Sequence, residues 1–194
     1  MTRIGVLALQ GAFAAHRAAL AEAGAEAVEV RRAAELPALD GLVIPGGEST
    51  TMLKLLASEG LLEPLRRFGE TKPIFGTCAG AVLLAREVSN PTQASLGLMD
   101  IAIERNAYGR QLSSRVAPVS LAPAFVNGDG ASEMEAVFIR APIIRRIGTQ
   151  VRALATYQGN PVLVEQGRHL VATFHPELTA DRRVHRLFLR KVTG

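Results

Sequence analysis

The sequence predicts an α/β fold in three layers, with a mostly parallel central sheet, helices on both of its faces and an antiparallel extension. Three observations support this fold class. In the first half of the chain, short apolar runs alternate with helical segments, as they do in parallel sheets. In the second half, apolar residues alternate with others, as in antiparallel strands. Two glycine-rich turns also directly follow apolar runs, at the strand ends where such sheets bind ligands.

The first half is expected to contain parallel strands separated by helices. Gly24 ends the first helix, because glycine readily adopts the left-handed conformation found after a helix C-terminus. Ser49 or Thr50 is expected to cap the second helix with its hydroxyl group. The expected strands cover residues 4–9, 27–30, 41–44 and 73–75, and the helices cover 13–23, a segment that begins near 49 and 81–87.

The second half is expected to form an antiparallel extension that packs against the parallel sheet. A turn is predicted at 127–130, where asparagine, aspartate and two glycines occur together. The chain has 194 residues, 48% of them hydrophobic, which is enough for a single domain over 1–194 with one sizeable core. The expected strands cover residues 99–103, 116–119, 137–139, 154–157, 162–165 and 170–174, and a helix covers 181–192.

Composition argues against binding of nucleic acids or membranes. The net charge is +4, and the densest basic stretch, 182–191, is interpreted as a solvated helix face because no nucleic-acid-binding motif accompanies it. No segment approaches the roughly 18 consecutive apolar residues of a membrane span. The N-terminus lacks the pattern of a secretory signal, so a cytoplasmic location is expected.

The only cysteine, Cys78, lies in the segment Gly-Thr-Cys-Ala-Gly at 76–80, between an expected strand and an expected helix. This is the pattern of a nucleophile elbow, in which a sharp turn exposes the nucleophile and flanking glycines allow close backbone approach. The helix start favours a thiolate, and the Ala79 N–H can point at an oxyanion. Without this context, a lone cysteine would be interpreted as a small core residue.

A cysteine nucleophile needs a base, and His175 is the best candidate among the four histidines. It follows the apolar strand at 170–174, and Glu177 stands two residues later, where it can orient the imidazole. Alone, a His-Pro-Glu segment is equally consistent with an exposed loop. The other histidines, His16, His169 and His185, are interpreted as structural or solvent-exposed.

A second glycine-rich turn, at 45–49, precedes an expected helix. Its backbone N–H groups can form an oxyanion nest, although a simple tight turn explains the same residues equally well. No cluster of histidine and cysteine has the spacing of metal ligands, so no metal and no cofactor are expected.

Taken together, these segments resemble the class I (triad) glutamine amidotransferases, which have a flavodoxin-like fold. Within that class, the chain is most similar to the glutaminase subunits (PdxT) of pyridoxal 5'-phosphate synthase. The segments that carry the resemblance run in family order over nearly the whole chain and cover residues 5–11, 42–51, 76–80, 104–111, 138–142 and 174–179. One departure is Ala15, where the family usually has glutamate before His16.

The resemblance implies a role for each matching residue. Cys78 would be the nucleophile, His175 the base and Glu177 the orienting acid. The oxyanion would be held at Gly47 and Ala79. Glutamine would be bound by Gly47, Glu48, Ser49, Arg105, Ile139 and Arg140. Without the family match, either arginine would be interpreted as part of a surface ion pair.

The implied activity is hydrolysis of L-glutamine, with ammonia passed to a (β/α)-barrel synthase subunit of the PdxS type in a heteromeric complex. Three alternatives stay open at this point. The chain can be a glutaminase for another acceptor, such as imidazole glycerol phosphate synthesis, although the segment 47–51 argues against this. It can be a stand-alone cysteine hydrolase or peptidase. It can also be a regulatory subunit that has only kept the fold.

Overall fold

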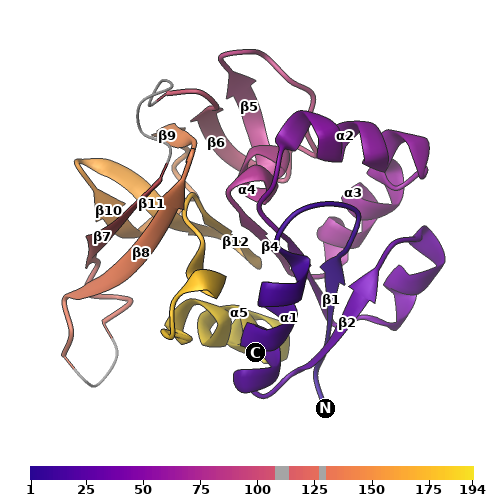
Figure 1. Ribbon diagram of the computed structural model, residues 1–194, viewed down its shortest axis with the longest axis horizontal. Helices are drawn as coiled ribbons and strands as arrows, with labels where there is room; N and C mark the ends of the chain where they lie inside the picture. Colours follow the sequence, from indigo (N-terminus) through magenta and orange to yellow (C-terminus); the bar gives the residue numbers. More distant parts are fainter. Residues whose placement is uncertain (108–113, 127–129) are drawn as a thin grey trace.

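The computed structural model describes residues 1–107, 114–126 and 130–194, and these residues form one sheet of nine strands beside a sheet of three (Figure 1). The strand order of the large sheet is β2-β1-β3-β4-β12-β11-β10-β7-β8. The expected turn at 127–130 lies mostly outside the described residues, as do residues 108–111 of the family-like segment 104–111.

The first five strands of the large sheet are parallel and provide its functional edge. Most of their residues are buried, which explains why they read as continuous apolar runs in the sequence. Strand β4 pairs with β12, with Thr77 opposite Ala172, so the residues that follow these two strands emerge side by side. The parallel strands are β2 (Glu26–Val30), β1 (Arg3–Leu7), β3 (Gly41–Ile44), β4 (Ile74–Thr77) and β12 (His169–Ala172).

The antiparallel extension is present, and it continues the parallel sheet edge to edge instead of packing against it. The junction is the antiparallel pairing of β12 with β11, two strands joined by a short turn. Extending the ladder satisfies the backbone groups at the edge of β12, which packing face to face would leave unpaired. The added strands are β11 (Asn160–Gln166), β10 (Arg152–Tyr157), β7 (Ser114–Leu121) and β8 (Glu133–Ile139).

The small sheet contains two differences from the sequence-based expectation. The helix expected at 81–87 is wrong beyond Leu84, because helix α4 (Ala79–Leu84) is followed at once by β5 (Ala85–Ser89). The cause is tertiary pairing: β5 lies parallel to β6 (Met99–Glu104), which supplies hydrogen bonds that a local pattern cannot reveal. Strand β9 (Ile143–Ile147), which pairs with the other edge of β6, was not expected.

Helices cover both faces of the large sheet, which gives the three expected layers (Figure 1). Side chains of α1 (Phe13–Glu22) and α5 (Arg183–Thr193) belong to one buried cluster, with Val43 and Phe75 of the sheet. Side chains of α2 (Ser49–Ser58), α3 (Leu62–Thr71) and α4 belong to the other, which also contains the small sheet. Two short 3₁₀ helices, η1 (Ala33–Ala38) and η2 (Pro176–Leu178), complete the described elements.

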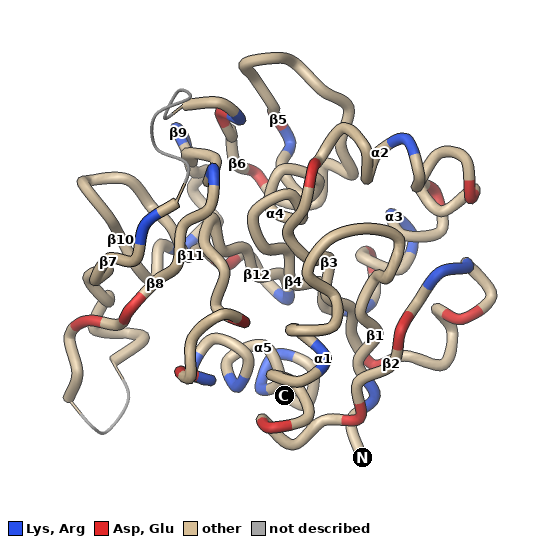
Figure 2. Tube along the Cα trace, in the orientation of Figure 1, with Lys and Arg blue, Asp and Glu red and all other residues tan. Residues whose placement is uncertain are grey.

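The terminal helix α5 is amphipathic, as the solvated-face interpretation requires. Val184, His185 and Phe188 are buried against the sheet, whereas Arg186 and Arg190 are exposed. Figure 2 shows positively charged residues recurring along this helix, with acidic residues distributed elsewhere over the chain. None of the helices in the described ranges is long and apolar enough to cross a membrane.

Helix α4 packs directly on β3, and Gly80 makes this contact possible. A Cβ atom at residue 80 would lie 2.0 Å from the carbonyl oxygen of Ile44, a backbone atom that cannot move without disturbing the sheet.

We therefore expect Gly80→Ala to lower the free energy of unfolding by about 3 kcal/mol, because this clash outweighs the roughly 1 kcal/mol that alanine gains over glycine in a helix. Urea unfolding measures the change. Gly60→Ala is the comparison for strain without a clash: a Cβ there meets no atom within 4 Å, but the φ of 64° is left-handed, so only about 1–2 kcal/mol should be lost. Equal losses in the two variants would contradict the packing argument.

Candidate active site

Cys78 occupies the sharp turn between β4 and α4 that the sequence predicts. Its φ of 48° and ψ of −103° are rarely adopted by residues with a side chain, and such strain costs about 1–3 kcal/mol. The turn is held by the Cys78 N–H, which donates to the Ala172 carbonyl of β12 at 2.9 Å. The thiol lies 3.8 Å from the Ile139 carbonyl oxygen, at the end of β8. The strained turn thus fixes the sulfur at the carboxyl edge of the sheet.

His175 and Glu177 form a buried hydrogen-bonded pair just beyond β12. The His175 N–H donates to the Val137 carbonyl at 2.8 Å, which anchors this segment to β8. Imidazole Nδ1 lies 2.7 Å from Glu177 Oε1, and the glutamate side chain is fully buried. Because an ionised carboxylate only accepts hydrogen bonds, Nδ1 must carry the proton. Nε2 is then the nitrogen available for chemistry.

The thiol and the imidazole meet at Gly46. A Cβ atom at residue 46 would lie 2.4 Å from His175 Cε1 and 3.2 Å from Cys78 Cβ. Burial lowers the pKa of His175, but hydrogen bonds and charge interactions with Cys78 and Glu177 raise it to about 10. The position of the imidazole between a sulfur and a carboxylate therefore favours its cationic form.

A cavity of about 260 Å³ opens in front of this pair. It brings together all of the residues predicted for the site except Glu177, which is buried behind His175. Four other residues, Gln10, Val82, Asn106 and Pro142, also line it. The predicted residues in its wall are Gly47, Glu48, Ser49, Cys78, Ala79, Arg105, Ile139, Arg140 and His175.

The Glu48 carboxylate caps helix α2, which corrects the prediction that Ser49 or Thr50 is the cap. It accepts hydrogen bonds from the backbone N–H groups of Thr50 and Thr51 at 3.0 and 2.7 Å. Although desolvation raises its pKa, these bonds and that of the Thr51 hydroxyl lower it to about 2. The Glu48 side chain reaches forward from the N-cap position over the first turn, whereas Ser49 and Thr50 are already inside the helix. Arg105 Nη2 is 2.7 Å from Thr50 Oγ1, so it lies at the same helix end.

Gln10 also lines the cavity, although its side chain is not of a type that marks a catalytic residue in the sequence. Its Oε1 accepts a hydrogen bond from the Glu48 N–H at 3.1 Å. This N–H belongs to the predicted oxyanion nest, and it is directed at Gln10 in this structure. Gln10 follows β1 at the same sheet edge as Cys78, which is the sequence signal that could have identified it.

Comparison with known proteins identifies the family of the chain. Residues 6–194 match the SNO glutamine amidotransferase family. The chain belongs to this family. It is 62% identical to pyridoxal 5'-phosphate synthase subunit PdxT of Solibacter usitatus, over 99% of this chain and 100% of the relative. It is 54% identical to the PdxT subunit of Koribacter versatilis, over 98% and 95% of the two chains.

A solved structure supports the fold assignment within the SNO glutamine amidotransferase family. A crystal structure described as a glutamine amidotransferase is 44% identical, with a TM-score of 0.88 over 98% of this chain and 99% of that one. The family-level resemblance, the α/β fold class and the expectation of an amidotransferase enzyme are therefore confirmed. In the described parts of the chain, no group of three or more histidine, cysteine, aspartate or glutamate side chains is arranged to hold a metal ion.

His16 also contacts the site, a contact that the sequence does not predict. It is fully buried in α1, and its Nε2 lies 3.2 Å from Glu177 Oε2, behind the His175–Glu177 pair. By contrast, His169 accepts a hydrogen bond from the Ile74 N–H at 3.2 Å and has a purely structural environment. Nothing local in the sequence distinguishes the two, because residues 16 and 177 meet only through packing of α1 on the sheet.

Proposed function

We propose that this protein is the glutaminase subunit of a pyridoxal 5'-phosphate synthase and hydrolyses L-glutamine to L-glutamate and ammonia with Cys78, His175 and Glu177. One observation carries the proposal: a strained cysteine and a histidine backed by a buried carboxylate line one cavity, whose wall also contains all of the predicted glutamine-binding residues. The names of the relatives, which are PdxT subunits of pyridoxal 5'-phosphate synthase, supply the pathway.

The first half-reaction is attack of the Cys78 thiolate on the side-chain amide carbon of glutamine. A C–S bond forms, and the amide oxygen becomes an oxyanion. His175, held as a cation, then donates the Nε2 proton to the amide nitrogen, and the C–N bond breaks to release ammonia. The product is a glutamyl thioester, and His175 is left neutral.

The second half-reaction hydrolyses the thioester. Neutral His175 removes a proton from water, the oxygen attacks the thioester carbon, and the C–S bond breaks to release glutamate. Cys78 leaves as the thiolate, and His175 retains the proton, which restores the starting state. Glu177 stabilises the cationic imidazole in both halves through the 2.7 Å contact with Nδ1.

Glutamine is proposed to bind with its α-carboxylate toward Arg105 and Arg140, since a guanidinium group can pair with both carboxylate oxygens. Glu48, Ser49 and Ile139 line the same wall of the cavity. The oxyanion is proposed to be bound by N–H groups at Gly47 and Ala79. Rotation of the peptide between Gly46 and Gly47, whose carbonyl oxygen accepts from the Ala12 N–H at 3.1 Å, would redirect the Gly47 N–H, and glycine permits such a change at low cost.

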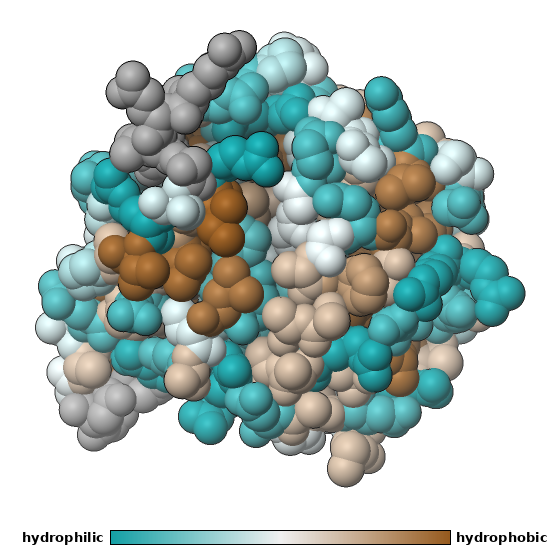
Figure 3. All heavy atoms as spheres, in the orientation of Figure 1, coloured by the Kyte–Doolittle hydropathy of each residue, from teal (hydrophilic) through white to brown (hydrophobic). Residues whose placement is uncertain are grey.

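The proposed partner is a synthase subunit of the PdxS type, in the cytoplasm, that receives ammonia before it can be protonated and lost to solvent. Among the described residues after Met1, the exposed large hydrophobic side chains are Val116 on β7 and Leu178, next to Glu177. Figure 3 shows apolar side chains gathered on this face over the antiparallel strands. A surface of this kind beside the active site suits a protein partner.

The proposal is tested by measuring glutamate and ammonia release from glutamine by the chain alone and with the synthase subunit. We expect hydrolysis with the partner, a lower rate without it, and no cleavage of glutamine-containing peptides. Cleavage of peptides would favour a stand-alone hydrolase. Stimulation only by an imidazole glycerol phosphate synthase would favour a different ammonia acceptor. Equal rates with and without the partner would contradict the proposal that docking activates the glutaminase.

A further inference from the structure

We infer that His16 is a positioning residue for Glu177, and that His185 in turn fixes the tautomer of His16. The inference rests on the proposed glutaminase function, because it assigns a task to groups that support the proposed His175–Glu177 pair. His16, Glu177 and His185 come from three different elements, α1, η2 and α5, which meet behind the active site.

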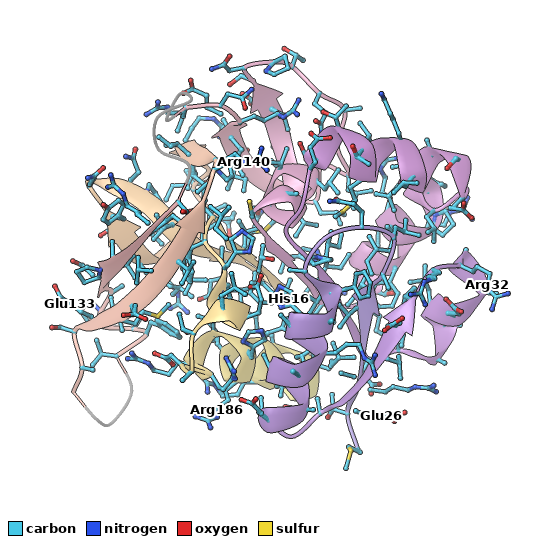
Figure 4. The ribbon with its side chains drawn as sticks, viewed as in Figure 1. His16, Glu26, Arg32, Glu133, Arg140 and Arg186 are labelled. Carbon is cyan, nitrogen blue, oxygen red and sulfur yellow. The ribbon has the colours of Figure 1, made fainter. Side chains whose placement is uncertain are left out.

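The geometry forms a continuous buried chain of polar groups. His16 Nε2 lies 3.2 Å from Glu177 Oε2 and 3.0 Å from Thr77 Oγ1, and His16 Nδ1 lies 3.1 Å from His185 Nε2. His16, Thr77 and His185 have no exposed surface. Figure 4 shows His16 pointing from α1 into the interior, whereas Glu26, Arg32 and Arg186 lie at the periphery.

Glu177 Oε2 lacks a hydrogen-bond donor, and His16 lies close enough to supply one. The other oxygen, Oε1, is engaged by His175, whereas Oε2 is buried and has no hydrogen bond of normal geometry among the described residues. A buried carboxylate oxygen without a donor is unfavourable, because it has lost its hydrogen bonds to water and gained none in return. An N–H on His16 Nε2 supplies the donor that this oxygen lacks.

Both supporting histidines are neutral at physiological pH. Burial lowers the pKa of His16 to about 4, against an opposing effect of Glu177 and with a further lowering by His175. Burial likewise lowers the pKa of His185 to about 3, with contributions from His16 and Arg182. In its neutral form each ring carries a single N–H, so His16 can direct one donor at most toward Glu177.

The tautomers follow from the partners of each nitrogen. With the proton on His16 Nε2, that N–H is shared by Glu177 Oε2 and Thr77 Oγ1, and Nδ1 accepts from the His185 Nε2–H. In the opposite tautomer, a lone pair of His16 would face the Glu177 carboxylate. His185 would then carry its proton on Nδ1, which is buried without a partner. Both effects are unfavourable, so the chain of bonds runs from His185 through His16 to Glu177.

This arrangement fixes the carboxylate from behind. With Oε2 3.2 Å from His16 Nε2 and Oε1 hydrogen-bonded to His175, Glu177 cannot rotate without breaking a buried hydrogen bond and moving Oε2 away from the His16 ring. The His175 ring is then held in one orientation and in its cationic form. Removal of the His16 donor is expected to loosen the carboxylate and to disfavour the cation, even though His16 lies outside the cavity wall.

Two isosteric substitutions separate this role from general packing. The amide of His16→Gln reaches the position of Nε2 and keeps a donor toward Glu177, whereas the amide of His16→Asn reaches only the position of Nδ1. In the complex with the synthase subunit, we expect His16→Asn to lower kcat about tenfold or more with little change in KM, as loss of such supporting partners typically does. We expect His16→Gln to retain most of the activity. Equal loss in both variants, or no loss in either, overturns the inference.

Alkylation of the single cysteine gives a readout that does not require glutamine turnover. The rate of modification of Cys78 by iodoacetamide follows the amount of thiolate that the cationic His175 sustains. We expect its rise with pH to shift to higher pH in His16→Asn and to stay in place in His16→Gln. His169→Asn is the control, since it alters a buried histidine outside the site and is expected to leave the profile unchanged.

The tautomers can be measured in the unmodified full-length chain, so the test survives if a variant does not fold. Imidazole ¹⁵N shifts and long-range ¹H–¹⁵N couplings at neutral pH are expected to show Nε2–H on both His16 and His185. A proton on Nδ1 of His16, or a doubly protonated His16, overturns the inference. If the tautomers agree but the chain with its partner hydrolyses no glutamine, the proposed function fails and the supporting network stands.

Discussion

Cys78→Ala is expected to reduce kcat for glutamine hydrolysis by about a millionfold, the size of effect found when the nucleophile of a triad is removed. No other residue can take over the attack, because Cys78 is the only cysteine and its strained turn places the sulfur in the cavity. Ammonia release from the complex with the synthase subunit measures the loss. Any activity above about one thousandth of the wild-type rate contradicts the assignment of the nucleophile.

The fold of this variant is expected to be unchanged. Alanine keeps the Cβ atom, so the cost of the positive φ at residue 78 is the same, and the backbone bond to Ala172 remains. Removal of the sulfur loses a weak contact with the Ile139 carbonyl at 3.8 Å and the interaction with the His175 ring, whose Nδ1 keeps its bond to Glu177. Thermal unfolding and binding to the synthase subunit are the controls, and both should match the unmodified chain. A large fall in the melting temperature would mean that lost activity reflects lost structure.

The parallel half of the sheet was predictable because all of its strands except the edge strand β2 are buried on both faces. An apolar run such as 41–44 carries that information locally. Helix α3 was not predicted, since Pro64 and Gly69 interrupt its pattern, although proline is tolerated in the first turn of a helix. Strand β5 was mistaken for the end of a helix because its partner, β6, is not visible in the local sequence.

The residues of the site that directly follow strands were predictable, because the ends of the strands can be recognised in the sequence. Cys78 follows β4 and His175 follows β12. Because these two strands pair in parallel, the nucleophile and its base lie at the same edge of the sheet. The cap at Glu48 and the contact of Gln10 depend on side-chain conformations that spacing does not determine. His16 and His185 are 169 positions apart, and only the packing of α1 and α5 on the same face brings them together.

Glu177→Gln is expected to lower kcat about 10⁴-fold, as when the orienting carboxylate of a Ser-His-Asp triad becomes an amide. Loss of the charge lowers the pKa of His175, which the carboxylate helps to raise to about 10. If the amide NH₂ turns toward His175 Nδ1, the ring proton of His175 moves to Nε2. Nε2 can then no longer accept a proton from the thiol or from water. Glutaminase assays and the pH profile of Cys78 alkylation check both effects.

A matched control is Glu165→Gln, which makes the same change at a buried glutamate outside the site. Glu165 pairs with Arg152 and Lys191, so this variant should lose stability and keep its activity. Similar losses of kcat in both variants would show that Glu177 matters only for folding. A small loss in Glu177→Gln, with an unchanged alkylation profile, would show that His175 does not need an orienting carboxylate.

The severity of Glu177→Gln should depend on His16, and this dependence connects the two sets of experiments. For the amide oxygen to accept from His175 Nδ1, the NH₂ group must face the His16 Nε2–H, so two donors would oppose each other. In the His16→Asn background that opposing donor is absent, and the productive orientation of the amide becomes accessible. We therefore expect Glu177→Gln to cost less there than in the wild-type background, with a coupling of roughly 0.5–3 kcal/mol in a double-mutant cycle. Independent, additive losses would mean that His16 does not act through the Glu177 carboxylate.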